Sequence, residues 1–467
     1  MHEQLQADPE KAVVKRPQFH VLLYLLLVLI LAAGAYFRFT GLDWDAGQHV
    51  HPDERFLTMV VDAIRPVPLS QYFNTSLSTL NPNNVGYGFY VYGTLPLFIV
   101  RYMAGWFNMT GYGQIYLMGR ILSAAADFLT VMLAFLISMR VYRKTRLGLL
   151  VLAFEAAAVL QIQLAHFFTV DTFSNLFTYL ALYFAVIVMT TPLPEAEQEL
   201  EPWSFAAWLK KIGPYVGFGV ALGMAAASKV NTAPVALVLP LAIFLRLSGM
   251  WTGRWDGRLR RMVLDGVLYV MLAAMVSLLV FRIFQPYAFS GPGFFNVKLN
   301  PDWIADLKEL RNQSTGDVDF PPALQWARRP IWFGWQNLTV WGLGLPLGWA
   351  AWAAFVWMGW RILRGEWRTH LLLWAWTGLY FLWQGTGFVS SMRYLLPIYP
   401  SLTIVAAWGL VRLWEGAEQA QRRKGLWRVL SLTLLVAVVA GTAAWAVAFT
   451  RIYHRPVIGS ASCRVRV

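Results

Sequence analysis

The chain has 467 residues, of which 57% are hydrophobic and only 14% are charged. A typical soluble domain is about 25% charged, so this composition excludes an ordinary soluble enzyme and indicates a membrane protein. The formal net charge is +14, but the Lys and Arg residues lie in short clusters between apolar runs. That distribution is typical of cytoplasmic loops and argues against a nucleic-acid-binding patch.

The apolar runs, taken in chain order, predict the membrane spans. The first run, residues 21–37, is followed by Arg38 rather than by a small-residue cleavage site, so we expect a signal anchor that stays in the membrane. Later runs are also close to the ~20 residues that a spanning helix needs. The predicted spans are residues 20–38, 115–139, 147–165, 172–190, 212–228, 232–248, 263–284, 336–360, 370–388, 395–413 and 429–449. The expected fold class is therefore all-α, a polytopic membrane protein with about eleven transmembrane helices.

The basic clusters predict the topology. With a cytoplasmic N-terminus, every connection on the cytoplasmic side carries Lys or Arg, as the positive-inside rule requires. Those clusters lie in residues 11–16, 140–146, 210–211, 246–261, 361–368 and 412–428. We therefore expect a cytoplasmic arm (residues 1–19), one transmembrane domain (residues 20–449) and a short outer-face tail (residues 450–467) that holds the single cysteine, Cys463. The acidic segment 192–202 is expected to be a cytoplasmic connector.

Two long segments, residues 39–114 and 285–335, fall on the outer side. The first contains an apolar stretch, residues 89–107, interrupted by Gly93, Pro96 and Arg101. Counting it as a span would invert every later loop, so we expect a helix that lies in the outer interface. Residues 303–311 predict a similar short amphipathic helix in the second segment.

The densest polar cluster follows the first span. Carboxylates and imidazoles are the groups needed for general base catalysis and for binding divalent metals. The alternative is a solvated polar loop, although Pro52 would fix the backbone just before Asp53 and so favours a functional site. The cluster comprises Asp43, Asp45, His49, His51, Asp53 and Glu54.

Further polar residues are expected on the same outer face. His166 and Asp171 lie where one span ends and the next begins, although Asp171 could also simply cap its helix. Lys229 and Arg393 are isolated cations that could grip a phosphate, or could reach the interface without any function. Residues 285–287 join this face from the second long segment.

Ionisable residues also fall inside the predicted spans. Arg120 and Asp127 lie seven positions apart on one face of a helix, and Glu155 lies in the next span. Such residues often mark functional sites, but a buried structural pair between helices is the favoured interpretation here because the outer cluster is richer. No phosphate-binding glycine loop is present in the sequence, which argues against an ATP-driven pump.

Four segments, in order, resemble the GT-C superfamily of membrane glycosyltransferases. The resemblance is to the branch of protein O-mannosyltransferases and aminoarabinose transferases, which is glycosyltransferase family 39-like. Residues 87–96 depart from the Pro-Pro-Leu-like start of the interfacial helix in that family. The segments that carry the resemblance are Asp53-Glu54 within His51-Pro-Asp-Glu-Arg, Gly119-Arg120-Ile-Leu-Ser123-Ala, Asp171, and Arg393-Tyr-Leu-Leu-Pro397-Ile-Tyr-Pro400.

This resemblance implies an enzyme that moves a sugar, with inversion, from a polyprenyl-phosphate donor to an acceptor at the outer face of the plasma (inner) membrane. The acceptor could be a protein, a glycolipid or a cell-wall polymer, and no nucleic acid is involved. The implied catalytic residues are Asp53 and Glu54. Those that orient the base or the acceptor are Asp171, His51 and His166, and those that bind the donor phosphate are Arg393, Lys229 and Tyr394.

Two questions stay open from the sequence. His49, His51, Asp53, His166 and Asp171 could together hold a divalent ion, but the resemblance requires none and we assign no metal. The alternative function is a lipid or solute transporter or flippase, which predicts ionisable residues at mid-membrane and matching halves. An assembly or scaffold protein, the remaining alternative, predicts no clustered outer carboxylates.

Overall fold

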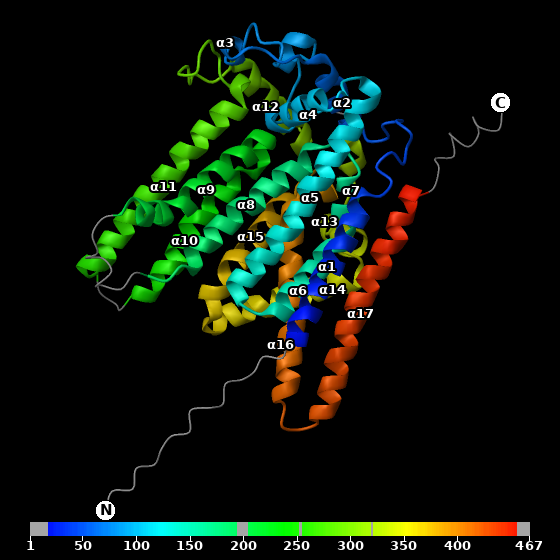
Figure 1. Ribbon diagram of the computed structural model, residues 1–467, viewed down its shortest axis with the longest axis vertical. Coiled ribbons are helices and arrows are strands. Elements are labelled where there is room, and N and C mark those ends of the chain that lie inside the picture. Colours follow the sequence, from blue (N-terminus) through cyan, green and yellow to red (C-terminus); the bar gives the residue numbers. More distant parts are fainter. Residues whose placement is uncertain (1–16, 194–203, 252–254, 319–320, 455–467) are drawn as a thin grey trace, which may run out of the picture.

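The computed structural model is a bundle of long helices, capped at one end by short ones (Figure 1). It describes residues 17–193, 204–251, 255–318 and 321–454. Within these ranges the regular structure is helical apart from one isolated bridge between Phe289 and Leu299, which confirms the all-α prediction. Most of the N-terminal arm, most of the acidic connector and most of the C-terminal tail with Cys463 lie outside the described residues.

Every predicted span coincides with helical structure. Seven described segments are long and apolar enough to cross a membrane, or eight if the bent pair α6 and α7 forms one span. The predicted spans at α9, α14 and α15 are helical but do not pass that test, so the total of about eleven stays a prediction. The long helices and the pair are α1 (Pro17–Phe39), α5 (Tyr112–Tyr142), α6 (Thr145–Ala156), α7 (Val159–Ala165), α8 (Val170–Thr190), α9 (Phe205–Ser228), α10 (Val238–Leu247), α11 (Gly257–Phe284), α14 (Leu345–Arg361), α15 (Trp367–Gly385), α16 (Tyr399–Gln419) and α17 (Lys424–Thr450).

Short helices from the two long segments gather at one end of the bundle, which we call the polar end (Figure 1). They are α2 (Pro52–Ala63), α3 (Leu69–Tyr72), α4 (Thr94–Trp106) and α12 (Pro301–Thr315), whereas α13 (Phe333–Asn337), also from the second segment, lies lower in the bundle. The 13 residues of α4 span only ~20 Å at ~1.5 Å per residue, too short for a ~30 Å hydrocarbon core. The expected non-spanning helices in both segments are therefore present.

The helix α2 was not predicted, although its start has a clear sequence signal. Pro52 occupies the first helical turn, where its missing N–H costs nothing. The His51 side chain caps the helix, because its Nδ1 accepts a hydrogen bond from the Asp53 N–H at 3.2 Å. Asp53 and Glu54 lie in the first turn, where the helix dipole favours negative charge.

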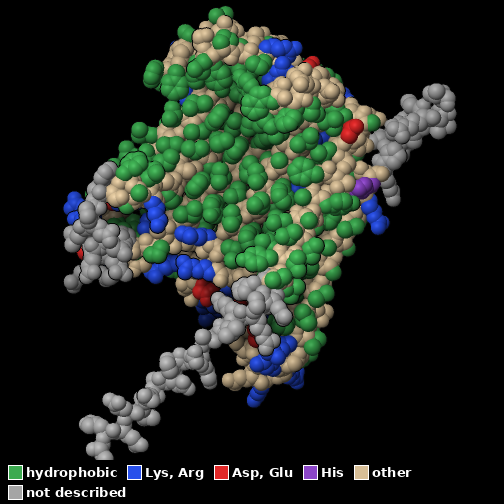
Figure 2. Space-filling model, in the orientation of Figure 1, with side chains coloured by type: hydrophobic (Ala, Val, Ile, Leu, Met, Phe, Trp, Pro, Cys, Tyr) green, Lys and Arg blue, Asp and Glu red, His purple; other side chains and the backbone are tan. Residues whose placement is uncertain are grey.

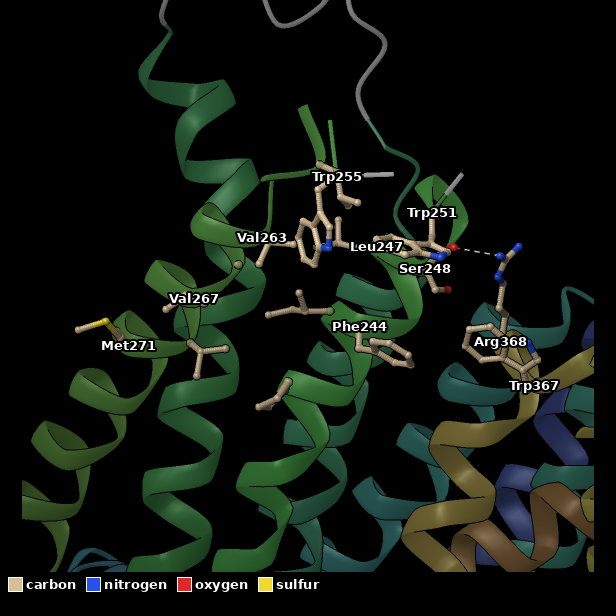
Figure 3. A pocket seen from close by; sticks show the side chains of 15 residues that line it. Phe244, Leu247, Ser248, Trp251, Trp255, Val263, Val267, Met271, Trp367 and Arg368 are labelled. Carbon is tan, nitrogen blue, oxygen red and sulfur yellow. Dashed lines mark hydrogen bonds between the residues drawn. The ribbon is translucent and has the colours of Figure 1, made fainter. Parts of the chain in front are cut away.

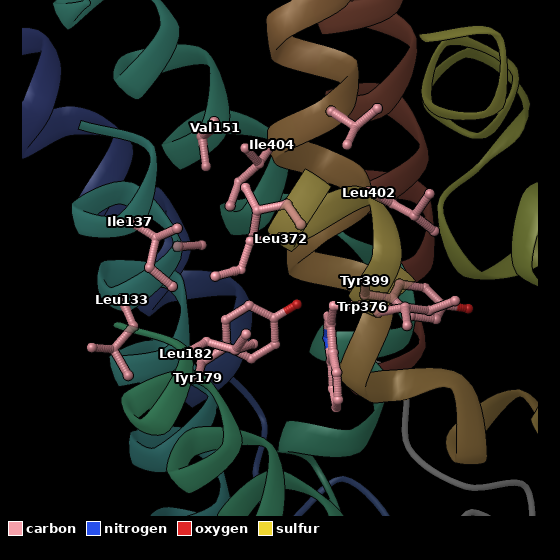
Figure 4. Packing of buried hydrophobic residues seen from close by; sticks show 14 of the residues in the cluster. Leu133, Ile137, Val151, Tyr179, Leu182, Leu372, Trp376, Tyr399, Leu402 and Ile404 are labelled. Carbon is pink, nitrogen blue, oxygen red and sulfur yellow. The ribbon is translucent and has the colours of Figure 1, made fainter. Parts of the chain in front are cut away.

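The core lies around α16, where α5, α6, α8 and α15 contribute apolar side chains (Figure 4). The span Met392–Gln419 is 94% buried, whereas the spans formed by α1, α11 and α17 are only 17% buried and face outward. Tyr179 Oη and Trp376 Nε1 both donate to the Pro397 carbonyl at 3.0 Å. These bonds hold the 3-10 segment Met392–Ile398, which carries Arg393 to the polar end.

Charged side chains are unevenly distributed over the surface. On the face drawn in Figure 2, hydrophobic side chains cover the middle, and most Lys and Arg gather toward the lower end, opposite the polar end. We call this lower end the basic end. It holds the connection between α16 and α17, with Arg422, Arg423 and Lys424. This distribution agrees with the positive-inside pattern, and the orientation of the chain in the membrane stays a prediction.

Candidate active site at the polar end

Two ion pairs meet at the polar end. Arg393 Nη1 donates to Asp53 Oδ2, and Lys229 Nζ donates to Asp171 Oδ1 at 2.6 Å. The side chains of Asp53 and Arg393 are 15% and 24% exposed, and those of Asp171 and Lys229 are 4% and 21% exposed. Asp53, Arg393 and Lys229 thus keep part of their side-chain surface exposed, whereas Asp171 is buried.

The ring of Tyr394 connects the two pairs. Lys229 Nζ lies 4.7 Å from the ring centroid, and the guanidinium carbon of Arg393 lies 5.4 Å from it. Two cations against one aromatic ring gain cation–π attraction, which offsets part of their mutual repulsion. The structure therefore brings together Asp53, Asp171, Lys229, Arg393 and Tyr394, which the sequence analysis had placed on one face.

A close backbone contact positions Lys229. The residue follows α9 directly, and the Gly93 N–H donates to the carbonyl of the preceding Ser228 at 3.1 Å. A Cβ atom on Gly93 would lie 2.0 Å from the Ala227 carbonyl oxygen, so only glycine fits at this position. The first long segment is thereby fastened to the end of α9 beside the site.

The second long segment is fastened to the same place. Gln285, which ends α11, accepts hydrogen bonds from the backbone N–H and the hydroxyl of Thr94 at 2.6 and 2.8 Å. Thr94 begins α4, so this glutamine joins the two long segments next to the site. The expectation that residues 285–287 join this face agrees with the geometry.

His51 lies against the first ion pair. Besides capping α2, its ring packs 5.0 Å from the ring of Phe167. Burial lowers the pKa of His51 below its usual value, while the Asp53 carboxylate acts in the opposite direction. A neutral imidazole keeps the Nδ1 lone pair that accepts the Asp53 N–H, so His51 orients the backbone of Asp53.

Asp171 does not act as a simple helix cap. It lies in the first turn of α8, but the cap position is Thr169, and no side chain makes the capping hydrogen bond. The Asp171 carboxylate instead accepts from Lys229. This geometry favours the functional interpretation of Asp171 over the capping alternative.

Glu54 is a correction to the expected catalytic set. Its side chain is fully buried, and both carboxylate oxygens accept from Arg120, at 2.7 and 2.6 Å. Glu54 Oε1 also accepts the Phe168 N–H at 2.9 Å, and Arg120 makes two further bonds of 2.9 Å to Asp45. With three hydrogen bonds accepted from protein donors and no exposed surface, Glu54 holds α2 against α5, which favours a structural role over a catalytic one.

His166 is a second correction. Its two ring nitrogens lie 2.7 and 2.9 Å from the carbonyl oxygens of Ile162 and Thr40, and its ring stacks on Tyr453 at 3.5 Å. The side chain is fully buried. These contacts favour a structural role for His166 over the expected role in orienting the acceptor, because both ring nitrogens face carbonyl oxygens of the protein.

Tyr92 belongs to the site and was missed from the sequence. Burial raises the pKa of Tyr92 well above its usual value, and the nearby Asp53 carboxylate adds to this effect. The phenol thus stays protonated and offers a hydrogen-bond donor beside Asp53. The available signal was its place in residues 87–96, where the sequence departs from the family pattern.

The acids inside the bundle are engaged in structural contacts. Asp127 pairs at 2.7 Å with Arg38 of α1 rather than with Arg120, the partner suggested by spacing. Glu155 accepts from Gln161 at 2.8 Å and from Thr403 at 2.6 Å. These contacts bear out the buried structural pair and remove the main support for a transporter.

The residues suggested for a divalent ion do not form a site as arranged here. Within the described ranges no three His, Cys, Asp or Glu side chains come close enough to share a metal ion. Asp53 and Asp171 each face a cation, and His166 is occupied by carbonyl oxygens.

A large cavity lies elsewhere, toward the basic end. It measures about 870 Å³ and opens between α10, α11 and α15, where Phe244, Trp255 and Met271 line it (Figure 3). Arg368 donates to the Ser248 carbonyl at 3.0 Å on its rim. The lining is apolar and contains no carboxylate or histidine, so this cavity offers no general base.

Comparison with known proteins finds solved structures of similar fold. No family model and no curated protein matches the chain. The structure is similar to a crystal structure of the oligosaccharyltransferase of Archaeoglobus fulgidus with Zn and sulfate, with a TM-score of 0.57, 14% identity and coverage of 91% of this chain and 53% of that one. The same enzyme, AglB, with an inhibitory peptide and a dolichol-phosphate gives a TM-score of 0.59, 14% identity and coverage of 92% and 56%.

A second similar structure is ArnT from Cupriavidus metallidurans bound to undecaprenyl phosphate, with a TM-score of 0.50, 15% identity and coverage of 94% of this chain and 76% of that one. The chain spans about half the length of the oligosaccharyltransferase. At such low identity these likenesses concern the fold. At the level of the fold they agree with the resemblance drawn from the sequence, because the chain shares a polytopic helical fold with the oligosaccharyltransferase and with ArnT.

Proposed function

We propose that the protein transfers a sugar from a polyprenyl-phosphate donor to an acceptor hydroxyl at the outer face of the plasma membrane, with its N-terminus in the cytoplasm. The observation that carries this proposal is the pair of partly exposed ion pairs, Asp53–Arg393 and Asp171–Lys229, on a fold shared with AglB and ArnT. The structures of those proteins in complex with dolichol-phosphate and with undecaprenyl phosphate support a polyprenyl-phosphate ligand.

The chemistry is a single displacement. The acceptor oxygen attacks the anomeric carbon of the sugar, while its proton passes to a carboxylate oxygen of Asp53. The bond between the anomeric carbon and the phosphate oxygen breaks on the opposite side, which inverts the configuration. Lipid phosphate leaves with the bonding electron pair, and Asp53 later returns the proton to water.

The cations stabilise the leaving group. Negative charge develops on the phosphate as the bond breaks, and preorganised donors aimed at that charge lower the barrier. Lys229 and Arg393 flank Tyr394 and can turn from their carboxylate partners to a phosphate. When Arg393 turns to the donor, the Asp53 carboxylate is released to act as base.

Four further residues support the reaction. His51 holds the backbone of Asp53 at the start of α2, and Tyr92 offers a proton donor beside its carboxylate. Asp171 holds Lys229 and orients the acceptor. Glu54 acts through Arg120 as a positioning residue.

A divalent cation has partial support, since the similar oligosaccharyltransferase was crystallised with Zn. The side chains of this chain do not fit one as they stand, because Asp53 and Asp171 are already neutralised by cations. Arg393 and Lys229 supply the positive charge that a metal would otherwise bring to the phosphate.

The test uses purified protein in lipid vesicles with a panel of radiolabelled polyprenyl-phosphate sugars, and it follows release of lipid phosphate. We expect wild type to consume at least one donor and Asp53→Asn to be slower by ~10²-fold or more, because positioned acid–base groups contribute that much. Equal release by both proteins would remove Asp53 from the mechanism. Consumption of none of the donors would contradict the proposed function.

A further inference from the structure

Arg101 is buried without a partner. It lies on α4 at the polar end and is 8% exposed, and its Nε and Nη1 atoms are buried with no hydrogen-bond partner. No ion pair or hydrogen bond of Arg101 is found among the described residues. Leaving a charged group both buried and unpaired costs several kcal/mol, so such a residue calls for an explanation.

The other buried arginines have the hydrogen-bond partners that Arg101 lacks. In the described part of the chain, Arg38, Arg120 and Arg282 are at most 3% exposed. Arg38 and Arg120 are bonded to carboxylates and carbonyls, and Arg282 donates to three carbonyl oxygens. The protein therefore satisfies its buried guanidinium groups elsewhere and leaves Arg101 with donors to spare.

The charge around Arg101 is positive. Burial lowers the pKa of Arg101, the nearby charge of Arg65 lowers it further, and Asp62 acts in the opposite direction. Arg65 follows α2 and donates to the carbonyl oxygens of Asp62 and Ile64, which holds it near the end of that helix. Two arginines against one aspartate leave a net positive charge, which favours an anion.

This position is separate from the proposed active site. Asp53 and Asp62 lie nine residues apart on α2, which corresponds to ~14 Å at ~1.5 Å per residue. The donor-phosphate cations Lys229 and Arg393 approach the first turn of α2, whereas Arg65 and Arg101 lie by its last turn.

We propose that Arg101 and Arg65 form a second anion-binding site at the polar end, which takes a phosphate group. Guanidinium groups are preferred partners of phosphate because they present several N–H donors and keep their charge. The phosphate is carried either by a lipid headgroup or by a soluble or acceptor molecule. This site is independent of the sugar-transfer proposal.

The experiment measures thermal unfolding of the full chain in nanodiscs of phosphatidylcholine, followed by Trp fluorescence, with inorganic phosphate or chloride at equal ionic strength. A ligand that binds only the folded state raises the melting temperature in a saturable way. We expect phosphate to do so for wild type, and Arg101→Gln to raise the phosphate concentration at half effect by about tenfold or more. Arg65→Gln gives a smaller change, because Arg65 is exposed.

Two control variants separate this site from other effects. Arg311→Gln removes an exposed arginine of α12 at the same end and should leave the response unchanged. Lys229→Gln weakens phosphate binding at the proposed donor site, and the response that remains in this variant is assigned to the Arg101 site, so a failure of the sugar-transfer proposal is distinguishable. An unchanged response in Arg101→Gln would overturn the proposal.

The lipid arm repeats the measurement in nanodiscs that contain phosphatidylglycerol. Stabilisation by this lipid, without an effect of inorganic phosphate, identifies a headgroup as the ligand. An effect of inorganic phosphate identifies a soluble or acceptor-borne phosphate. No response to either, or a ligand-free Arg101→Gln protein that melts far below wild type, would show that Arg101 has a structural role and overturn the proposal.

Discussion

The polar end holds two kinds of ion pair with the same chemistry and different surroundings. The network of Arg120 with Asp45 and Glu54 is fully buried, and its donors and acceptors are saturated by protein atoms. The pairs Asp53–Arg393 and Asp171–Lys229 lie nearby but stay partly exposed and make fewer contacts. We call the first the closed network and the second the open pairs.

The closed network has a structural role, whereas the open pairs are available to take part in chemistry. A buried pair contributes to stability only while both partners remain, and removing one leaves an uncompensated charge. An open pair is screened by solvent, contributes little stability and can exchange its partner for a substrate. Glu54 and Asp53 are neighbours in sequence, yet α2 turns one toward Arg120 and the other toward Arg393.

We expect the largest effect on stability when Arg120 is removed from the closed network. Arg120→Gln leaves the carboxylates of Asp45 and Glu54 buried without a cation, so we expect a loss of about 3–5 kcal/mol in the free energy of unfolding. The measurement is the melting temperature in detergent, with Asp53→Asn as the matched control at the open pair. Equal melting temperatures of Arg120→Gln and Asp53→Asn would show that the closed network and the open pairs do not differ in their contribution to stability.

A smaller effect on stability, together with a loss of activity, should follow from Lys229→Gln. Removing one preorganised donor to the leaving phosphate slows the reaction by ~10²–10³-fold. Because Asp171 is buried, removing Lys229 also leaves its carboxylate without a cation, so the melting temperature should fall, though less than for Arg120→Gln, where two buried carboxylates lose their cation. Release of lipid phosphate and thermal unfolding are measured on the same samples, and a folded variant with wild-type release would remove Lys229 from the site.

The pH dependence of stability tests the role of His51, which lies against the open pair Asp53–Arg393. Burial lowers the pKa of folded His51 below the 6.5 of the unfolded chain, so the unfolded state takes up the proton first. The stability that His51 provides is therefore complete above pH 6.5 and decreases as the pH falls below it, when protonation also removes the cap on the Asp53 N–H.

The variant His51→Asn tests this dependence, since asparagine caps helices as well and does not titrate. We expect melting temperatures below pH 6.5 to fall less steeply for the variant than for wild type. His49, whose pKa burial also lowers, contributes equally to both proteins. Parallel pH profiles would show that His51 does not titrate in this range.

The smallest effect should come from Glu155→Gln inside the bundle. The amide keeps an acceptor and the shape of the side chain between Gln161 and Thr403, so we expect a stability change below about 1 kcal/mol and unchanged sugar transfer. A loss of transfer of more than tenfold would place Glu155 in the mechanism. Solute uptake by vesicles that this variant abolishes would revive the transporter alternative.

The sequence determined the membrane class and the helical segments, because apolar runs and basic clusters report directly on the lipid environment. The topology predicted from the sequence also placed Asp53, Asp171, Lys229 and Arg393 on one face of the membrane. The start of α2 was readable too, since His51 and Pro52 carry a local capping signal.

Only the tertiary structure decided which polar residues are open and which are closed. Glu54 and His166 belong to the same sequence clusters as Asp53 and Asp171, yet their partners, Arg120 and the carbonyl oxygens of Ile162 and Thr40, come from other segments. Burial and hydrogen-bond saturation depend on how distant segments pack, and no local pattern encodes that. For the same reason the sequence did not indicate that Tyr92 lies beside Asp53 or that Arg101 is buried without a partner.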